Sequence, residues 1–147
     1  MTIRFSSGLR EAVLTDYGLG AMMNYGTIEV YSGPQPASAS LAPTGTLLAR
    51  ITLDGDAFVP GTTAGALTLA LSAEGALVKD GEWRMKGVAA GTAGWWRWKG
   101  NAYDDDSDSL FYPRMDGAEG ESLQLVVKEI TASTDVVITN FEVNILE

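Results

Sequence analysis

Apolar and polar residues alternate along most of the chain after residue 26. In residues 27–32 the apolar Ile28 and Val30 share one side, and the same alternation recurs in residues 46–54 and 66–72. A period of two predicts β-strands that each have one buried face and one wetter face. Five more strands are predicted at residues 82–88, 94–101, 110–115, 122–128 and 135–146.

Clusters rich in Gly, Pro, Ser, Asp and Thr separate these segments, as in VPGTTAG, VAAGTAG and MDGAEGE. Such residues supply the backbone angles that tight turns require. No long helical pattern lies between the strands, so a parallel sheet with helical crossovers is not expected. The pattern predicts an all-β domain over residues 27–147, an antiparallel, jelly-roll-like β-sandwich of about eight strands.

The first 26 residues have a different pattern, which predicts a short amphipathic helix. Ser6 or Ser7 is placed to cap its first turn, and Leu9 and Val13 follow near helical spacing. Gly18 and Gly20 are expected to end it, with one further turn over residues 21–23. Two interpretations remain open. The segment either packs on the sandwich or extends from it as an arm that docks on a neighbouring copy.

Residues 32–45, SGPQPASASLAPTG, form the most loop-like stretch of the chain. Fourteen residues are long for a plain connection. The segment, which includes Pro34 and Pro36, is either a contact loop or a crossing between two sheets.

Three of the four tryptophans fall within residues 95–98. If residues 82–88 and 94–101 pair as a hairpin, the simplest assignment turns Trp83, Met85, Trp96 and Trp98 inward, where each indole buries on the order of 200 Å². A one-residue slip in register would exchange the two faces. The opposite face would then carry an aromatic residue surrounded by cations: Trp95, Arg84, Lys86, Arg97 and Lys99.

Two interpretations fit this outward face. The first is a contact patch for an acidic partner surface or a polar ligand such as a sugar, with Trp95 as the anchor. The second is a solvated strand face on which Arg97 or Lys99 lies over the indole of Trp95.

An acidic run, DDDSDS, follows the tryptophans. Asp104, Asp106 and Asp108 occupy positions 1, 3 and 5 of a calcium-loop count, but Ser109 stands where Gly is needed and Met115 where Glu is needed. An EF-hand is therefore excluded. The run is expected to be a solvated loop, an irregular cation site, or an acidic partner for the cationic face within one chain or between copies.

Composition limits the available chemistry. The chain has 147 residues, no His and no Cys, and a net charge of −9. A Ser-His-Asp triad and thiolate metal sites are therefore excluded, which leaves a pair of carboxylates as the main catalytic possibility. The acidity disfavours nucleic acid and anionic membranes as partners. No cofactor, metal or catalytic residue is predicted, and the chain is not expected to be an enzyme.

Four stretches resemble a family of small tailed-bacteriophage and prophage proteins: RFSSGLREAVLT, GTIEVYSGPQPASASLAPTGTLLARITLDGDAF, AAGTAGWWRWKGNA and PRMDG. Together they span most of the chain. Members of this family lie among virion morphogenesis genes and are mostly without assigned activity. The resemblance implies a virion structural protein and carries no catalytic residues.

The hypothesis from the sequence is a non-enzymatic virion protein, foremost a capsid decoration or cement protein. It would be made in the host cytoplasm without a signal peptide, and would act as a homo-oligomer or at symmetric sites against other capsid or tail proteins. The alternative is a carbohydrate-binding module of a tail appendage or head fibre with a host glycan as ligand. The predicted contact residues are Trp95, Arg97, Lys99, Arg84, Lys86, Leu9, Val13, Pro34 and Pro36.

Overall fold

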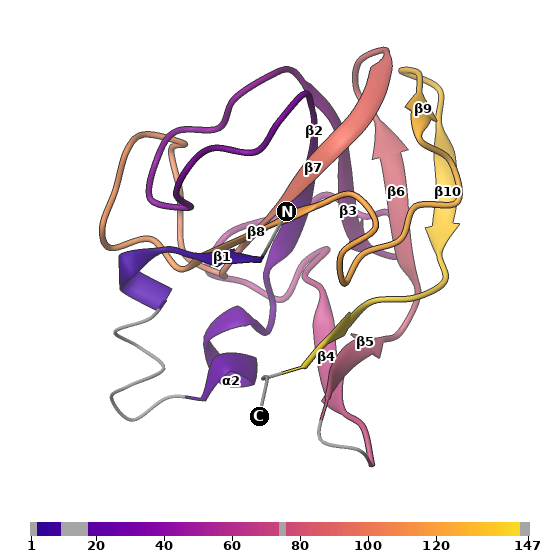
Figure 1. Cartoon of the computed structure of the whole chain (residues 1–147). Helices are drawn as coiled ribbons and strands as arrows, with labels where there is room; N and C mark the ends of the chain where they lie inside the picture. The colour runs from indigo at the N-terminus through magenta and orange to yellow at the C-terminus, as the bar shows by residue number, and fades with distance from the viewer. Residues whose placement is uncertain (1–2, 10–17, 74–75, 145–147) are drawn as a thin grey trace.

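The chain folds into two antiparallel sheets, as a computed structural model of residues 3–9, 18–73 and 76–144 shows (Figure 1). The larger sheet has eight strands and the smaller has three. This confirms the predicted all-β, sandwich-like fold. The elements are β1 (Arg4–Phe5), α2 (Leu19–Met23), β2 (Thr27–Ser32), β3 (Leu47–Leu53), β4 (Thr68–Leu71), β5 (Leu77–Asp80), β6 (Trp83–Gly87), β7 (Gly91–Lys99), β8 (Arg114–Ala118), β9 (Glu129–Ile130), β10 (Asp135–Ile138) and β11 (Glu142–Val143).

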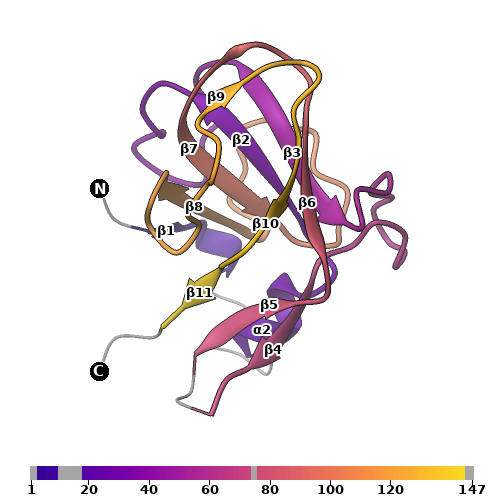
Figure 2. The same cartoon turned by 90° about the vertical axis from the view of Figure 1, so that its right-hand side faces the viewer.

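The large sheet has the strand order β1-β8-β7-β2-β3-β6-β10. β9 pairs with the start of β7, and after a short turn β10 pairs with β6, so residues 129–138 bridge two strands that the sheet order separates (Figure 2). The three strands β11-β5-β4 form the second sheet beside it. The inner faces of β6 and β7 meet in the core, where the ring centroids of Trp83 and Trp98 lie 5.3 Å apart.

The core is built around Phe141, which lies between three indoles. Its ring centroid is 5.2 Å from those of Trp83 and Trp98 and 5.7 Å from that of Trp96. All four side chains are buried, and Met85 is buried beside them. This confirms the predicted inward face of residues 83, 85, 96 and 98. Offset and edge-on packing of aromatic rings adds to the free energy gained from burying their area.

The described part of the N-terminal segment packs on this same core. Ser6 Oγ accepts a hydrogen bond from the backbone N–H of Leu9 at 3.2 Å, which is the predicted cap of a helical turn over residues 7–9. Leu9, Leu19 and Met23 are buried members of the core. The further turn predicted over residues 21–23 is present as part of α2, but Gly20 lies inside this helix and not in the break before it. Val13 lies outside the described residues. Within the described residues, no helix combines the length and the apolar character needed to span a membrane.

Several predicted strands are wrong in pairing or extent. β6 and β7 do not form a hairpin, because β6 pairs with β3 and β10 whereas β7 pairs with β2 and β8. The predicted strand at 110–115 begins only at Arg114, and residues 122–128 form no strand. The predicted strand at 135–146 divides into β10 and β11, which join different sheets.

Candidate functional site

The outer face of the large sheet carries rows of charged side chains. Because residues alternate across a strand, the buried Trp96 and Trp98 of β7 place Arg97 and Lys99 on the opposite face. Register then sets Arg97 between Asp116 of β8 and Glu29 of β2. Two loops, residues 33–46 and 100–113, run over this part of the face (Figure 1). They convert what would be a solvated surface into an interior.

Arg97 and Asp116 form a fully buried ion pair, since both side chains are 0% exposed. Arg97 Nε donates to Asp116 Oδ1 at 2.7 Å, and Arg97 Nη2 donates to Asp116 Oδ2 at 2.8 Å. The third bond, from Arg97 Nη1 to the carbonyl oxygen of Leu41 at 2.9 Å, reaches into the first loop. A bidentate ion pair of this kind fixes the orientation of the guanidinium group and also compensates its charge.

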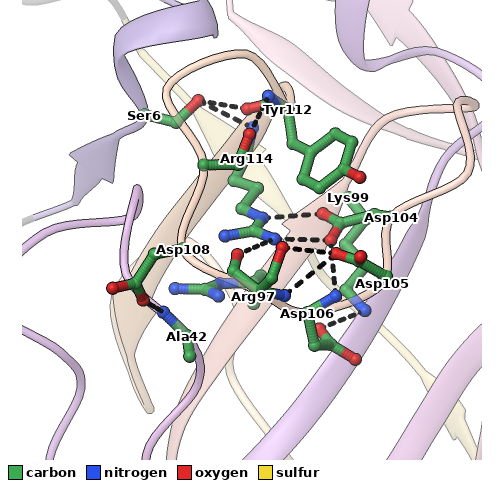
Figure 3. A network of polar contacts seen from close by, with 12 residues as sticks. Ser6, Ala42, Arg97, Lys99, Asp104, Asp105, Asp106, Asp108, Tyr112 and Arg114 are labelled. Carbon is green, nitrogen blue, oxygen red and sulfur yellow. Dashed lines mark hydrogen bonds and ion pairs between the residues drawn. The ribbon is translucent and has the colours of Figure 1, made fainter.

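Arg114 fixes the second loop in the same way (Figure 3). Its guanidinium donates from Nε to Asp104 Oδ2 at 2.6 Å, from Nη2 to Asp104 Oδ1 at 2.5 Å, and from Nη2 to the carbonyl oxygen of Ser107 at 2.9 Å. Its Nη1 also approaches the carbonyl oxygen of Leu41 at 3.4 Å. One carbonyl group of the first loop therefore accepts from both buried arginines.

Lys99 joins the sheet to the acidic run. Its Nζ lies 3.0 Å from Glu29 Oε2 and 2.5 Å from Asp106 Oδ1. The hydroxyl of Tyr31 also donates to Glu29 Oε2, at 2.6 Å. Each charge in this cluster thus has an opposite charge or a donor beside it, as buried ionic groups require.

Trp95 is buried under the first loop rather than exposed. Its ring stacks on that of Tyr31, with centroids 4.7 Å apart, and its Nε1 donates to the carbonyl oxygen of Thr44 at 3.2 Å. The guanidinium carbon of Arg97 lies 5.4 Å from the indole centroid. The indole therefore anchors the loop to the sheet.

The predicted outward contact face is therefore wrong for its three central residues. Trp95, Arg97 and Lys99 are buried inside one chain because the two loops cover them. The alternation of apolar and polar residues does not predict this cover. Leu9 and Pro36 are buried too, whereas Pro34 is exposed. Of the predicted cations, Lys86 is exposed, and Arg84 is partly exposed and pairs with Glu82 and Asp135. All four tryptophans are buried, so none offers a surface on which a sugar could stack.

The acidic run pairs within the chain, which is one of the alternatives that the sequence left open. Asp104 binds Arg114, Asp106 binds Lys99, and Asp108 Oδ1 accepts from the backbone N–H of Ala42 at 2.7 Å. Among the described residues, no three carboxylates are grouped as metal ligands would be. These aspartates hold the two loops to the sheet and to each other.

In the cluster under the loops, ion pairs lower the pKa values of two carboxyl groups, those of Asp104 and Glu29. Burial alone raises the pKa of Asp104, but hydrogen bonds from Arg114 and from the N–H of Asp106 outweigh it, so the pKa lies below its ordinary 3.8. Burial likewise raises the pKa of Glu29, but the charge of Lys99 and the hydrogen bond from Tyr31 outweigh it. The pKa of Glu29 therefore lies below its ordinary 4.5. A lowered pKa in the folded state stabilises the fold above the ordinary pKa, and this contribution is lost as pH falls.

Asp104→Asn is therefore expected to destabilise the protein most near neutral pH. The difference in the free energy of unfolding between wild type and variant should shrink as the pH falls from about 6 to about 2, because the wild-type carboxylate becomes protonated as well. Urea unfolding at a series of pH values measures this difference. A difference that stays constant over the range would contradict the ion pair.

The two loops also carry exposed apolar residues where their backbones lie close together. Ser109 N–H donates to the carbonyl oxygen of Ser40 at 2.8 Å, so the chain before Leu110 and Phe111 lies against the chain before Leu41. Leu41, Leu110 and Phe111 are 40%, 60% and 82% exposed. We call these three residues the loop patch. The sequence contains no alternation or motif that marks them, and they were not predicted.

Comparison with known proteins adds no relative. No family model matches the chain, and neither a curated protein nor a solved structure has significant similarity to it. The resemblance to phage proteins therefore rests on the four sequence stretches alone.

Proposed function

We propose that this chain is a non-enzymatic structural protein of a bacteriophage virion that decorates or cements the capsid. The resemblance of its four stretches to proteins of virion morphogenesis supports this role. The buried carboxylates Glu29, Asp104 and Asp116 are engaged in ion pairs that fasten loops, a structural use of charge. The partners are other virion proteins and further copies of the chain, arranged at symmetric sites.

The observation that carries the proposal is the loop patch. Large apolar side chains that are exposed together on a monomer mark interaction surfaces. Arg97 holds the loop of Leu41 to the sheet, and Arg114 holds the loop of Leu110 and Phe111 through Asp104 and Ser107. Little conformational freedom therefore remains to be lost when a partner binds. The net charge of −9 keeps free copies soluble until the patch meets its site.

The first test asks whether the protein is in the particle. Virions from the phage or prophage that encodes the chain are purified by density gradient, and the protein is sought by mass spectrometry and by immunogold labelling. The proposal predicts a defined copy number on the capsid. A particle that is infectious, intact and free of the protein would overturn it.

The second test maps the contact to the loop patch. Leu110→Asp is expected to lower incorporation about tenfold or more, because a charge at the centre of an apolar contact removes a main contributor to binding. Leu71→Asp is the matched control, since Leu71 is 72% exposed on β4 of the small sheet. Equal incorporation of both variants, each folded by circular dichroism, would show that the patch is not the contact.

A further inference from the structure

A groove of about 490 Å³ lies on the part of the outer face that the two loops leave open. Its floor is formed by side chains of β2, β3 and β6, among them Glu29, Thr52 and Lys86. The loop after β3 contributes Phe58 to the walls, and the loop after β7 contributes Tyr103. The volume falls in the range of pockets that bind small organic ligands.

Two cations of the floor stand directly opposite each other. Arg50 of β3 and Lys86 of β6 are cross-strand partners, and like charges in that position repel. Arg50 Nε lies 3.5 Å from Glu29 Oε1, with about half of the Arg50 side chain exposed. Lys86 has Asp135 of β10 as its cross-strand partner on the other side, but that carboxylate forms its ion pair with Arg84, and no described residue lies within ion-pair distance of the Lys86 ammonium group. A ligand carboxylate between the two cations would relieve their repulsion and accept from both.

The rest of the lining excludes a polyanion. Glu29, Asp56 and Asp104 lie along the same groove, and the chain as a whole carries a charge of −9. A string of carboxylates or phosphates would meet these anions as soon as it extended beyond Arg50 and Lys86. The lining fits a ligand with a single negative group whose remainder is neutral and rich in hydroxyls, which can donate to the carboxylates.

The walls supply an apolar surface for the neutral part. Tyr103, which is 72% exposed, and Phe58 both line the groove. The face of an aromatic ring suits ligands whose rings have an apolar face of their own. Sugar rings have this character, and their hydroxyls suit the polar floor.

We propose that this groove binds a short acidic oligosaccharide through one sugar carboxylate held by Arg50 and Lys86, with a neighbouring ring against Tyr103. The site is separate from the loop patch and independent of the virion role. It also does not involve the tryptophans, which are all buried.

The proposal is tested by NMR titration of the full chain with sialyl-lactose, which carries one carboxylate. Its methyl ester and a triglutamate peptide serve as comparison ligands. The expected result is saturable binding at about 1 mM, with shifts at Lys86 and Tyr103. The ester should bind about tenfold more weakly, because it cannot make the charged hydrogen bonds.

Lys86→Gln and Arg50→Gln are each expected to weaken binding about tenfold, with unchanged melting temperature. Arg84→Gln is the matched control, because Arg84 is a cation of the same strand as Lys86 that does not line the groove. Binding of the peptide but not the sugar would overturn the proposal. An equal effect of Arg84→Gln, or no binding of sialyl-lactose at tenfold higher concentration, would do so as well.

Discussion

Replacing Arg97 by methionine should lower the free energy of unfolding by about 3–5 kcal/mol, the usual effect of removing one partner from a buried ion pair. The variant leaves the carboxylate of Asp116 in a site where it is 0% exposed. It also removes the hydrogen bond to the carbonyl oxygen of Leu41, so the first loop loses an attachment to the sheet. Most of the loss comes from the isolated carboxylate and not from the strength of the pair itself.

Urea unfolding measures this loss against two other variants. Arg84→Met removes an arginine of a partly exposed pair on the same face and should leave the unfolding midpoint nearly unchanged. The double variant Arg97→Met/Asp116→Leu should recover much of the stability, because no charge stays buried. If Arg97→Met were no more destabilising than Arg84→Met, Arg97 would not be buried in the protein.

Replacing Trp98 by alanine should lower the free energy of unfolding by about 3–5 kcal/mol through the cavity it leaves. The indole is fully buried, with its centroid 5.3 Å from that of Trp83 and 5.2 Å from that of Phe141. Its Nε1 donates to the carbonyl oxygen of Met23 at 2.9 Å, which ties the end of α2 to β7. The variant therefore loses both core packing and the attachment of the N-terminal segment.

Thermal and urea unfolding followed by circular dichroism measure this effect. Trp98→Phe keeps much of the packing but loses the hydrogen bond, so its loss should be smaller. Tyr103→Ala removes an exposed ring and is expected to have little effect on stability. Similar midpoints for Trp98→Ala and Tyr103→Ala would contradict the inward orientation of Trp98.

Alternation was sufficient to predict four central strands of the large sheet, β2, β3, β6 and β7, and the inward face of β6 and β7. β2 matches its predicted bounds, and Trp83, Met85, Trp96 and Trp98 face inward as expected. These results follow from the period of two, which depends only on neighbouring residues. The pairing of strands cannot be predicted from this period, because it joins segments that are distant in the sequence. The short turn between β6 and β7 suggested a hairpin, but β3 and β2 lie between these two strands in the sheet.

The candidate sites were harder to predict for a related reason. Alternation shows which side of the sheet carries Arg97 and Lys99, but it does not show what covers that side. The length of the 33–46 loop and the acidic run after β7 were the available signals, since opposite charges near one another in sequence can pair within a chain. The loop patch and the groove bring together side chains from separate loops, and no local pattern marks either.

The most direct test of the account is an NMR measurement of the arginine side chains. In a ¹⁵N-labelled sample, the Nε–H groups of Arg97 and Arg114 should give separate signals that exchange slowly with water. These groups donate to Asp116 and Asp104 at 2.7 and 2.6 Å in the interior. Asp116→Asn should shift or remove the first signal, and Asp104→Asn the second. Exchange as fast as that of the partly exposed Arg84 would show that the loops do not close over this face, and would contradict the account.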